Sequence, residues 1–590
     1  MSVATGPEAP GDGDRQAAFA ATLVDEWVRA GVADAVVCPG SRSTPLALAV
    51  AAETRLRLHI RLDERSAGFT ALGIGMATGR PAVVVVTSGT AAAELHASVV
   101  EADLARVAMI VCTADRPPEL QDVGAPQTID QTHLYGRAVR WSGDPGVPDE
   151  ASRPSWRSIG SRAVAEAVAG PLGPGPVHLN LPFREPLLGD AGAGGVPDGR
   201  PGGAPWHLVD AAPVQPAGPV AEDLVASAGI VPGSRGLLVA GAGCGDPAVV
   251  RKLAEVLAWP VLADPRSGLR CPGAGTVVAA ADGILRAPGF AAAHRPDTVL
   301  VLGERWASKV VTTFLSGATR VVVAPHGAWI DPERSAARVV RCDPTRLCEA
   351  LVEAVGRHGG GSGRWAADWQ EAEARARGVI DGSLGGPGGW SEPALAHRLV
   401  RDLPEGWRLV VSSSMPVRDV EAFGAPRAVP PIVLANRGAN GIDGVVSTAL
   451  GVALATGPTV ALVGDLAFLH DVSALVGPAG EDAPLTVVVV DNGGGGIFSF
   501  LPPATGLDAG TFERLFGTPQ AADVASVAAG FGWAVEDLDE AAASDALAAA
   551  LGRAATRGGR TVVRVRLPGR VANVTVHDRI NAAVAAAVDG

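Results

Sequence analysis

The sequence has little of what marks membrane or secreted proteins. Among its 590 residues, no apolar run approaches the ~18 residues that a membrane-spanning helix needs. The first residues, MSVATGPEAPGDGDRQ, lack a basic segment followed by an apolar one, so we expect a short disordered lead and no signal peptide. These absences predict a cytoplasmic protein without an integral membrane segment.

Cysteine is scarce too, and acidic residues outnumber basic ones. The cysteines show no C-x-x-C spacing, which suggests neither a zinc site nor a disulfide framework. The net charge of -13 argues against nonspecific binding to nucleic acid or anionic lipid, so a few placed arginines would have to hold any anionic ligand. We expect the cysteines to be buried as small apolar residues: Cys38, Cys112, Cys244, Cys271, Cys342 and Cys348.

Short apolar runs alternate with amphipathic stretches along the whole chain. Its length predicts about three or four domains of roughly 150 residues each. Runs such as PAVVVVTSG and LTVVVVDN have no polar alternation, which is typical of strands buried on both faces of a parallel sheet. The predicted fold class is therefore α/β, with parallel sheets covered by helices.

Two segments interrupt this alternation. Residues 189–205 and 356–390 are rich in glycine and proline or lack β-branched residues, as linkers do. Division at these segments predicts three α/β domains, at residues 14–188, 206–357 and 391–590.

The first and third domains share a repeated stretch. TALGIGMATGRPAVVVV, from Thr70, aligns with TALGVALATGPTVALV, from Thr448, with one residue deleted before the proline. We interpret the repeat as a duplication; the alternative is a chance match between two helix–strand units. Six positions before the threonines stand Glu64 and Ile442. The copies thus carry different functional groups, as expected of two domains that face each other across one site.

Two polar side chains follow neighbouring strands predicted in the third domain. Asp465 ends TVALVGD, and Asn492 ends LTVVVVDN and precedes four glycines, 493–496. Ligands bind beyond the carboxyl ends of parallel strands, and a carboxylate, an amide oxygen and a glycine carbonyl suit Mg²⁺ shared with phosphate oxygens. The bare glycine backbone would let N–H groups approach the phosphates. Alternatively, Asp465 caps a helix and Asn492 starts a turn.

The G-D pair, 26 residues and then an asparagine resemble the diphosphate and metal motif of thiamine diphosphate enzymes. Those enzymes have duplicated pyrimidine-binding and diphosphate-binding domains with a third domain between. Within them, VCPGSRSTPLALA, TADRPPELQDVGAPQ, ANRGANGIDG, GDLAFLHD and GGIFSFLP closely resemble the MenD family of menaquinone (vitamin K2) biosynthesis, the 2-succinyl-5-enolpyruvyl-6-hydroxy-3-cyclohexene-1-carboxylate (SEPHCHC) synthases.

The resemblance differs in strength along the chain. It spans the pyrimidine-binding domain (14–188) and the diphosphate-binding domain (391–590), and it is weaker in the middle domain (206–357), where WASKVV is the main match. The superfamily's G-D-G is G-D-L here, this family's usual form. Gly493 and Gly496 stand where relatives often carry asparagine or glutamine, which puts those side-chain contacts in doubt.

The resemblance implies an activity. The family decarboxylates 2-oxoglutarate on thiamine diphosphate and adds the succinyl carbanion equivalent 1,4 to isochorismate, which gives SEPHCHC and CO₂. The implied cofactors are thiamine diphosphate and Mg²⁺, with Mn²⁺ able to replace it. The implied assembly is a homodimer or homotetramer with active sites at the subunit interface.

The resemblance also implies how the cofactor is bound. Glu64 matches the glutamate that hydrogen-bonds N1′ of the pyrimidine; alternatively, it is a helix N-terminal charge stabilised by the dipole. Ile442 matches the apolar side chain that keeps the cofactor bent. The metal ligands would be Asp465, Asn492 and the Gly494 carbonyl. Further cofactor contacts would come from Gly441, Gly464, Leu466, Gly495, Ile497 and Phe498.

Both implied substrates are dicarboxylates, which the planar fork of arginine suits best. Arg418 and Arg437 match the residues that hold the succinyl end. Phe498 and Leu501, with Ile497, would form an apolar wall against water, or are plain core. The residues that match those around isochorismate are Ser41, Arg42, Arg116, Gln127, Lys309 and Ser414. Of these, Arg116 could instead be a surface turn residue and Lys309 a solvated helix residue.

Other functions stay open. LLVAGAGCGD resembles a dinucleotide fingerprint, but G-x-G-x-x-G requires glycine where Asp246 stands, which counts against a nucleotide-binding oxidoreductase. We expect the middle domain to have a Rossmann-like shape without a nucleotide. Another thiamine enzyme, such as an acetohydroxyacid synthase or a 2-oxoacid decarboxylase, handles smaller and less charged acceptors. A noncatalytic relative would lack the glutamate that is present as Glu64.

Overall fold

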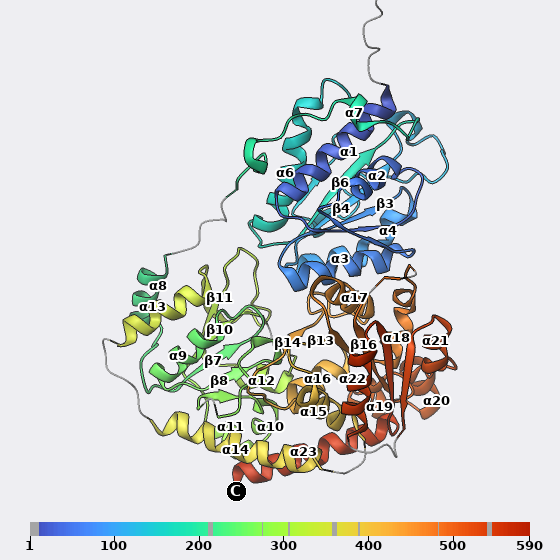
Figure 1. Cartoon of the computed structure of the whole chain (residues 1–590). Coiled ribbons are helices and arrows are strands. Elements are labelled where there is room, and N and C mark those ends of the chain that lie inside the picture. The colour runs from blue at the N-terminus through green and yellow to red at the C-terminus, as the bar shows by residue number, and fades with distance from the viewer. Residues whose placement is uncertain are drawn as a thin grey trace, which may run out of the picture. The chain divides into compact units, whose positions relative to one another are not determined.

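The part of the chain that the structure describes forms three six-stranded sheets whose strands pair in parallel (Figure 1). The computed structural model describes residues 11–209, 216–273, 275–304, 307–356, 363–386, 390–478, 480–481, 483–539 and 545–590. The predicted α/β class is confirmed. Residues 1–10 of the expected disordered lead lie outside the described residues. Helix α1 begins at Asp12, so the expectation is wrong for residues 12–16.

The chain divides into two compact units. The first holds residues 1–212, 436–457 and 470–483. Its sheet has the order β2-β1-β3-β4-β6-β5, with α1, α2 and α6 packed on one face and α3 and α5 on the other. The strands are β1 (Asp34–Val37), β2 (Arg57–Ile60), β3 (Ala82–Val86), β4 (Met109–Asp115), β5 (Trp141–Gly143) and β6 (Pro176–Pro182). The helices are α1 (Asp12–Arg29), α2 (Thr44–Ala52), α3 (Glu64–Thr78), α4 (Thr90–Glu94), α5 (His96–Ala105), α6 (Trp156–Ala169), α7 (Ala191–Gly194) and α17 (Val445–Thr456).

The second unit holds the middle sheet, of order β12-β11-β10-β7-β8-β9. Counted along the chain, this is the doubly wound order 3-2-1-4-5-6 read from its other edge, so the Rossmann-like shape expected of the middle domain is confirmed. Its strands are β7 (Gly236–Ala240), β8 (Val261–Ala263), β9 (Val277–Val278), β10 (Thr298–Leu302), β11 (Thr319–Val323) and β12 (Ala336–Val340). Its helices are α8 (Ala217–Ser227), α9 (Pro247–Leu257), α10 (Ala281–Ile284), α11 (Pro288–Ala293), α12 (Lys309–Phe314) and α13 (Pro344–Gly356).

The second unit also holds the third sheet, of order β14-β13-β15-β16-β18-β17. Its strands are β13 (Arg408–Val411), β14 (Ile432–Leu434), β15 (Thr459–Gly464), β16 (Leu485–Asp491), β17 (Ala534–Leu538) and β18 (Arg560–Arg566). The remaining helices are α14 (Arg364–Leu384), α15 (Glu392–Asp402), α16 (Met415–Phe423), α18 (Asp465–His470), α19 (Pro503–Gly506), α20 (Ala509–Phe512), α21 (Val524–Gly530), α22 (Ala546–Arg557) and α23 (Arg570–Asp589).

The two segments predicted as linkers contain helices. In the first, α7 packs against α1. In the second, α14 is 21 residues long and buries Trp365, Trp369 and Ile380 in a core shared with the middle sheet. The linker prediction for this stretch is wrong because a lack of β-branched residues also suits a helix of alanine, arginine and glutamate. Residues 357–362 and 387–389 of the segment lie outside the described residues.

The repeat corresponds to a duplicated fold. The first and third sheets have the same strand order, 2-1-3-4-6-5 when each is counted from its own first strand. The two TALG stretches lie in equivalent places, on α3 before β3 and on α17 before β15. A chance match between two unrelated helix–strand units does not explain a shared order of six strands, so the duplication hypothesis is supported.

The repeated glycines explain why the TALG pattern occurs twice. Helices α3 and α17 lie side by side, and a Cβ atom on Gly73 would overlap the backbone carbonyl of Thr448 (Figure 1). In the same way, a Cβ atom on Gly451 would overlap the carbonyl of Thr70. Each glycine thus packs on the threonine of the other copy. The motif therefore allows a close helix crossing that larger residues would prevent.

We expect Gly73→Ala and Gly451→Ala to destabilise the first unit by about 2 kcal/mol, the usual cost of overpacking a tight core. The measurement is the midpoint of urea unfolding. Gly552→Ala is the matched control, because Gly552 lies within α22 and a Cβ there has nothing within 4 Å. This control should be neutral or stabilising by up to ~1 kcal/mol. Unchanged midpoints for both core variants would contradict the close crossing.

A buried aspartate secures the start of α17. Asp471 is fully buried and accepts hydrogen bonds from Ser447 N, at 2.7 Å, and Ser447 Oγ, at 2.9 Å. Burial raises the pKa of the Asp471 carboxyl to about 7, although the Ser447 hydrogen bonds act in the opposite direction.

The Asp471 pKa predicts a pH dependence of stability. The pKa is about 7 in the folded chain, against 3.8 ordinarily. Between these values the folded state keeps a proton that the unfolded state has released, so this stabilising contribution is full below pH ~4 and is lost as pH rises to about 7. We expect Asp471→Asn to flatten the fall in unfolding free energy across this range, measured in urea. Parallel curves for the two proteins would contradict the assignment.

Candidate active site

The carboxyl edge of the third sheet brings together the polar residues predicted there. Asp465 directly follows β15, and Asn492 directly follows β16. The two strands are neighbours, and Gly464 is paired with Val490. The prediction that both residues emerge at one edge of the sheet is therefore confirmed.

The carboxylate of Asp465 is hydrogen-bonded to the backbone. It is 7% exposed, and its Oδ1 accepts a hydrogen bond from Leu466 N at 2.7 Å. Burial raises the pKa of this carboxyl to about 6, and the nearby Asp491 acts in the same direction. The backbone N–H groups of Leu466 and Gly494 and the charge of Arg570 partly oppose this rise. A cation beside Asp465 would favour the ionised form.

The amide of Asn492 has one partnered and one unpartnered end. Its Nδ2 donates to Glu392 Oε1 at 2.6 Å. Its Oδ1 is buried and has no hydrogen-bond partner among the residues that the structure describes. A buried oxygen without a donor costs free energy unless a ligand or water satisfies it. The Asn492 oxygen is therefore available to a ligand at the sheet edge.

These donors match a metal that prefers oxygen. Within the described ranges, no group of three or more His, Cys, Asp or Glu side chains could hold a metal ion. An ion here would instead take one carboxylate, from Asp465, one amide oxygen, from Asn492, and a backbone carbonyl, with other ligands from outside the protein. That is the sparse oxygen set that Mg²⁺ accepts.

The four glycines after Asn492 form a fixed turn. Gly493 and Gly494 have φ angles of 78° and 128°, which favour glycine. A Cβ atom on Gly494 would overlap the carbonyl of Gly517, and Gly495 N donates to that same carbonyl at 2.8 Å. Packed backbone on both sides excludes a flexible linker. The Gly494 carbonyl, which is the predicted metal ligand, accepts a hydrogen bond from Gly496 N at 2.8 Å. Its second lone pair is left for a metal ion.

Half-buried apolar side chains follow the glycines. Ile497 and Phe498 lie in a 3₁₀ helix, Gly496–Phe500, and Leu501 follows it. The Phe498 ring lies 5.3 Å from the Phe516 ring, centroid to centroid. These side chains lie next to the polar edge and are incompletely covered, so the structure is compatible with the predicted apolar wall.

The neighbouring strand β13 contributes two further predicted residues. Ser414 precedes α16 with a φ of 72°, a strained value for a residue that is not glycine. Arg418 Nη1 donates to the Ser414 carbonyl. Because β13 pairs with β15, Ser414 and Arg418 lie at the same sheet edge as Asp465.

A second polar edge lies in the first unit. Ser41 and Arg42 follow β1, Glu64 begins α3 after β2, and Arg116 follows β4. These strands are consecutive in the sheet apart from β3, which lies between β1 and β4. Burial raises the pKa of the Glu64 carboxyl, and the charges of the neighbouring acids add to the rise. Glu64 is thus a half-buried carboxyl that holds a proton more readily than usual.

Arg116 and Gln127 are close together at this edge. Arg116 Nη2 donates to the Pro126 carbonyl at 3.2 Å, while its Nε is buried and unpartnered within the described residues. Gln127 has a φ of 56°, and its Nε2 donates to the Ser88 carbonyl at 3.1 Å. The half-buried Arg116 does not resemble an exposed turn residue.

Two of the predicted residues have other roles or surroundings. Arg42 is 4% exposed, and its guanidinium donates to the Phe183 carbonyl at 2.9 Å and lies 3.4 Å from Glu185. Lys309 is exposed at the start of α12 and lines a shallow pocket of about 330 Å³ with Arg295. Exposure of Lys309 agrees with the alternative of a solvated helix residue. Trp306 of WASKVV lies outside the described residues.

The loop with Arg437, Gly441 and Ile442 is held by a residue that the sequence did not indicate. Glu101 of α5 is 3% exposed and accepts hydrogen bonds from Gly438 N, at 2.7 Å, and Ala439 N, at 2.6 Å. Arg437 and Ile442 are half-buried. A glutamate in the middle of a helix carries no local sign of such a role.

Two other residues were also missed. Glu392 looked like an ordinary acidic first-turn residue of a helix. Arg570 follows β18 and begins α23, where it donates to the carbonyls of Gly493 and Gly517. A basic residue just beyond the strand RTVVRVRL was a usable signal, because carboxyl ends of parallel strands bind ligands.

The contacts of Asp246 bear on the dinucleotide fingerprint of the middle domain. Asp246 caps α9 by accepting from Ala248 N at 2.7 Å, so a carboxylate occupies the place where a dinucleotide phosphate would bind.

Five of the six cysteines are buried, Cys271 is half-buried, and all are free thiols. Among the described helices, none combines the length and apolarity needed to span a bilayer.

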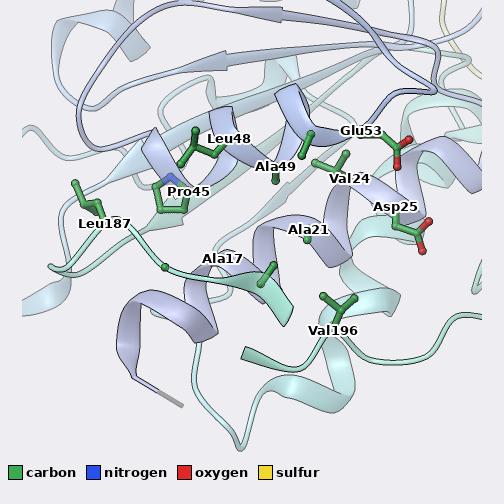
Figure 2. A pocket seen from close by; sticks show the side chains of 13 residues that line it. Ala17, Ala21, Val24, Asp25, Pro45, Leu48, Ala49, Glu53, Leu187 and Val196 are labelled. Atoms are coloured by element: carbon green, nitrogen blue, oxygen red, sulfur yellow. The ribbon is translucent and has the colours of Figure 1, made fainter. Parts of the chain in front are cut away.

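The first unit also has a cavity. It has a volume of about 420 Å³ and lies between α1, α2 and the segment from Leu187 to Val196 (Figure 2). Alanine, valine and leucine side chains line most of it, and Asp25 and Glu53 lie at one end (Figure 2). No predicted site residue lines this cavity.

Comparison with known proteins identifies the family. The chain matches the models "Thiamine pyrophosphate enzyme, N-terminal TPP binding domain" over residues 18–134, "Middle domain of thiamine pyrophosphate" over 229–411, and "Thiamine pyrophosphate enzyme, C-terminal TPP binding domain" over 425–565. Thiamine pyrophosphate is another name for thiamine diphosphate.

Individual relatives show which family of thiamine diphosphate enzymes this chain resembles. A 2-succinyl-5-enolpyruvyl-6-hydroxy-3-cyclohexene-1-carboxylate synthase of Myxococcus xanthus is 43% identical, over 98% of this chain and 98% of its own. The synthase of the same name from Thermobifida fusca is 43% identical, over 97% of this chain and 99% of its own. The one from Geobacillus kaustophilus is 44% identical, over 86% of this chain and 88% of its own. This chain belongs to the thiamine diphosphate enzymes and, within them, to the family of the SEPHCHC synthases.

Proposed function

We propose that this chain is a SEPHCHC synthase of menaquinone biosynthesis, which releases CO₂ from 2-oxoglutarate and adds the remaining succinyl unit 1,4 to isochorismate. The observation that carries the proposal is the sheet edge with Asp465, the unpartnered Oδ1 of Asn492 and the glycine turn. Near full-length similarity to proteins with this name supports it.

The third sheet holds the charged end of the cofactor. Asp465, Asn492 Oδ1 and the Gly494 carbonyl would hold Mg²⁺, with Mn²⁺ able to replace it. Bare backbone at 493–496 would face the diphosphate, beside Gly464 and Leu466. Bound thiamine diphosphate supplies the electron sink that makes decarboxylation of a 2-oxoacid possible.

Glu64 holds a proton at the pyrimidine N1′ position. A half-buried carboxyl with a raised pKa shares a proton with a ring nitrogen more readily than an exposed one does. Ile442 provides the apolar support beside Gly441, on the loop that Glu101 holds. Ile497, Phe498 and Leu501 keep water away from the reacting carbon.

Cationic and polar side chains bind the two dicarboxylate substrates. Arg418 and Arg437 hold the succinyl end, because a guanidinium fork matches a carboxylate. The residues assigned to isochorismate are Ser41, Arg42, Arg116, Gln127, Lys309 and Ser414. In the described part of the chain, Arg42 and Arg116 each have a buried Nε without a partner. The Arg42 guanidinium also donates to the Phe183 carbonyl and pairs with Glu185, so Arg116 has the better local support.

The working form is a homo-oligomer. In the family that the sequence resembles, each active site combines the pyrimidine-binding domain of one subunit with the diphosphate-binding domain of another. Glu64 and Asp465 belong to different compact units of this chain. The resemblance thus implies a homodimer as the minimum assembly. A cytoplasmic location stays a prediction from the sequence.

A different thiamine diphosphate enzyme is the alternative. Arg42 has internal contacts to Phe183 and Glu185, so its role toward a charged acceptor is less well supported than that of Arg116. An acetohydroxyacid synthase or 2-oxoacid decarboxylase would need fewer cations, and it would release CO₂ without isochorismate.

The deciding experiment measures CO₂ release from 2-oxoglutarate by the holoenzyme with and without isochorismate. We expect release to depend on isochorismate and SEPHCHC to form. Glu64→Gln should lower kcat about 100-fold or more, the usual range for loss of a proton-transfer group. Glu150→Gln is the control, since Glu150 is exposed in the same unit and pairs with Arg153, and should stay within a few fold. Cofactor-loaded protein that ignores isochorismate would refute the substrate assignment.

The glycine turn gives a separate test of cofactor binding. Gly494→Val places a branched side chain at a φ of 128° and against the Gly517 carbonyl, so the turn cannot keep its shape. We expect no thiamine diphosphate binding by calorimetry, with the far-ultraviolet circular dichroism retained. Gly506→Ala, at an open position twelve residues later, should bind normally. Normal binding by Gly494→Val would show that the turn does not contact the cofactor.

A further inference from the structure

The orientation of the Asn492 amide is set by a residue one hundred positions earlier in the chain. Asn492 Nδ2 donates to Glu392 Oε1 at 2.6 Å, and the sequence separation is 100 residues. Glu392 is 3% exposed and stands in the first turn of α15, after the cap Ser391. The contact therefore depends on the packing of α15 against the end of β16.

We propose that Glu392 is a positioning residue that presents Asn492 Oδ1 to the divalent cation; the inference rests on the proposed function. The terminal torsion of asparagine is broad and close to two-fold, so an amide can offer either its oxygen or its nitrogen. Glu392 Oε1 accepts from the NH₂ end and repels the oxygen end, both when the carboxyl is ionised and when it holds its proton on Oε2. The Glu392 contact thus leaves only the oxygen for a metal.

Gly496 makes room for this arrangement. A Cβ atom at position 496 would lie 2.8 Å from Asn492 Nδ2 and 3.7 Å from Glu392 Oε1. Any larger residue would press on the Asn492–Glu392 hydrogen bond. The last of the four glycines therefore has its own role, distinct from that of Gly494, which packs on Gly517.

The test measures Mn²⁺ affinity by electron paramagnetic resonance, with thiamine diphosphate present and no substrate. We expect Glu392→Leu to weaken Mn²⁺ binding 10- to 100-fold, the usual effect of removing a hydrogen-bond partner of a metal ligand. Glu392→Gln should stay within about threefold, because its amide oxygen still accepts from Asn492 Nδ2. The readout does not depend on turnover.

Glu421→Leu is the matched control. Glu421 is also 3% exposed, lies on α16 in the same unit, and accepts a hydrogen bond from Ser308 N at 3.3 Å. Its loss removes a buried carboxylate and leaves Asn492 untouched. Mn²⁺ affinity should therefore remain near that of the wild type, and equal losses in Glu421→Leu and Glu392→Leu would overturn the proposal.

An exchanged pair keeps the proposal testable if Glu392→Leu fails to fold. Asn492→Asp places two carboxylates face to face, and the added Glu392→Gln gives the new carboxylate a donor. We expect the double variant to bind Mn²⁺ more tightly than Asn492→Asp alone. No gain from the second change would overturn the positioning role. If the wild type itself failed to bind Mn²⁺ with thiamine diphosphate, the proposed function would fail instead.

Discussion

The close crossing of α3 and α17 is the contact on which the rest of the first unit depends. Gly73 and Gly451 each pack on a threonine carbonyl of the other helix, so the two backbones meet without side chains between them. Glu64 begins one helix, and Ile442 precedes the other. The crossing therefore sets the separation of these two residues. Ser66 and Ser447, 2.8 Å apart, and the buried Asp471 hold the same contact with hydrogen bonds.

At the carboxyl edge of the third sheet, buried polar groups create a demand for a positively charged ligand. Asp465 and Glu392 are buried, as is the Oδ1 atom of the half-buried Asn492, and the burial of each of these oxygens costs free energy. Burial raises the pKa of Glu392 above its usual range, and Asp419 and Asp465 add to the rise. A divalent cation would relieve this concentration of acidic groups. The edge therefore favours a positively charged ligand in addition to Arg570.

Much of the architecture was readable from short-range patterns. Unbroken runs such as LTVVVVDN indicate doubly buried strands, and the polar residue after each run marks the ligand-binding edge. The same reasoning failed for α14, because the absence of β-branched residues fits a helix as well as a linker. Glu101 and Glu392 were missed since their partners, Gly438 and Asn492, are distant in sequence.

The sequence by itself determined the fold class, the repeat, and which strand ends carry polar residues, because each of these depends on local composition and period. Tertiary structure alone decided which end of the Asn492 amide is free, what the four glycines contact, and which acids hold the loops. Gly494 packs on Gly517, Gly496 leaves space for a hydrogen bond, and neither partner is encoded nearby. Hydrogen bonds and close contacts join whichever groups the packed elements bring within about 3 Å, and residue spacing along the chain does not specify that proximity.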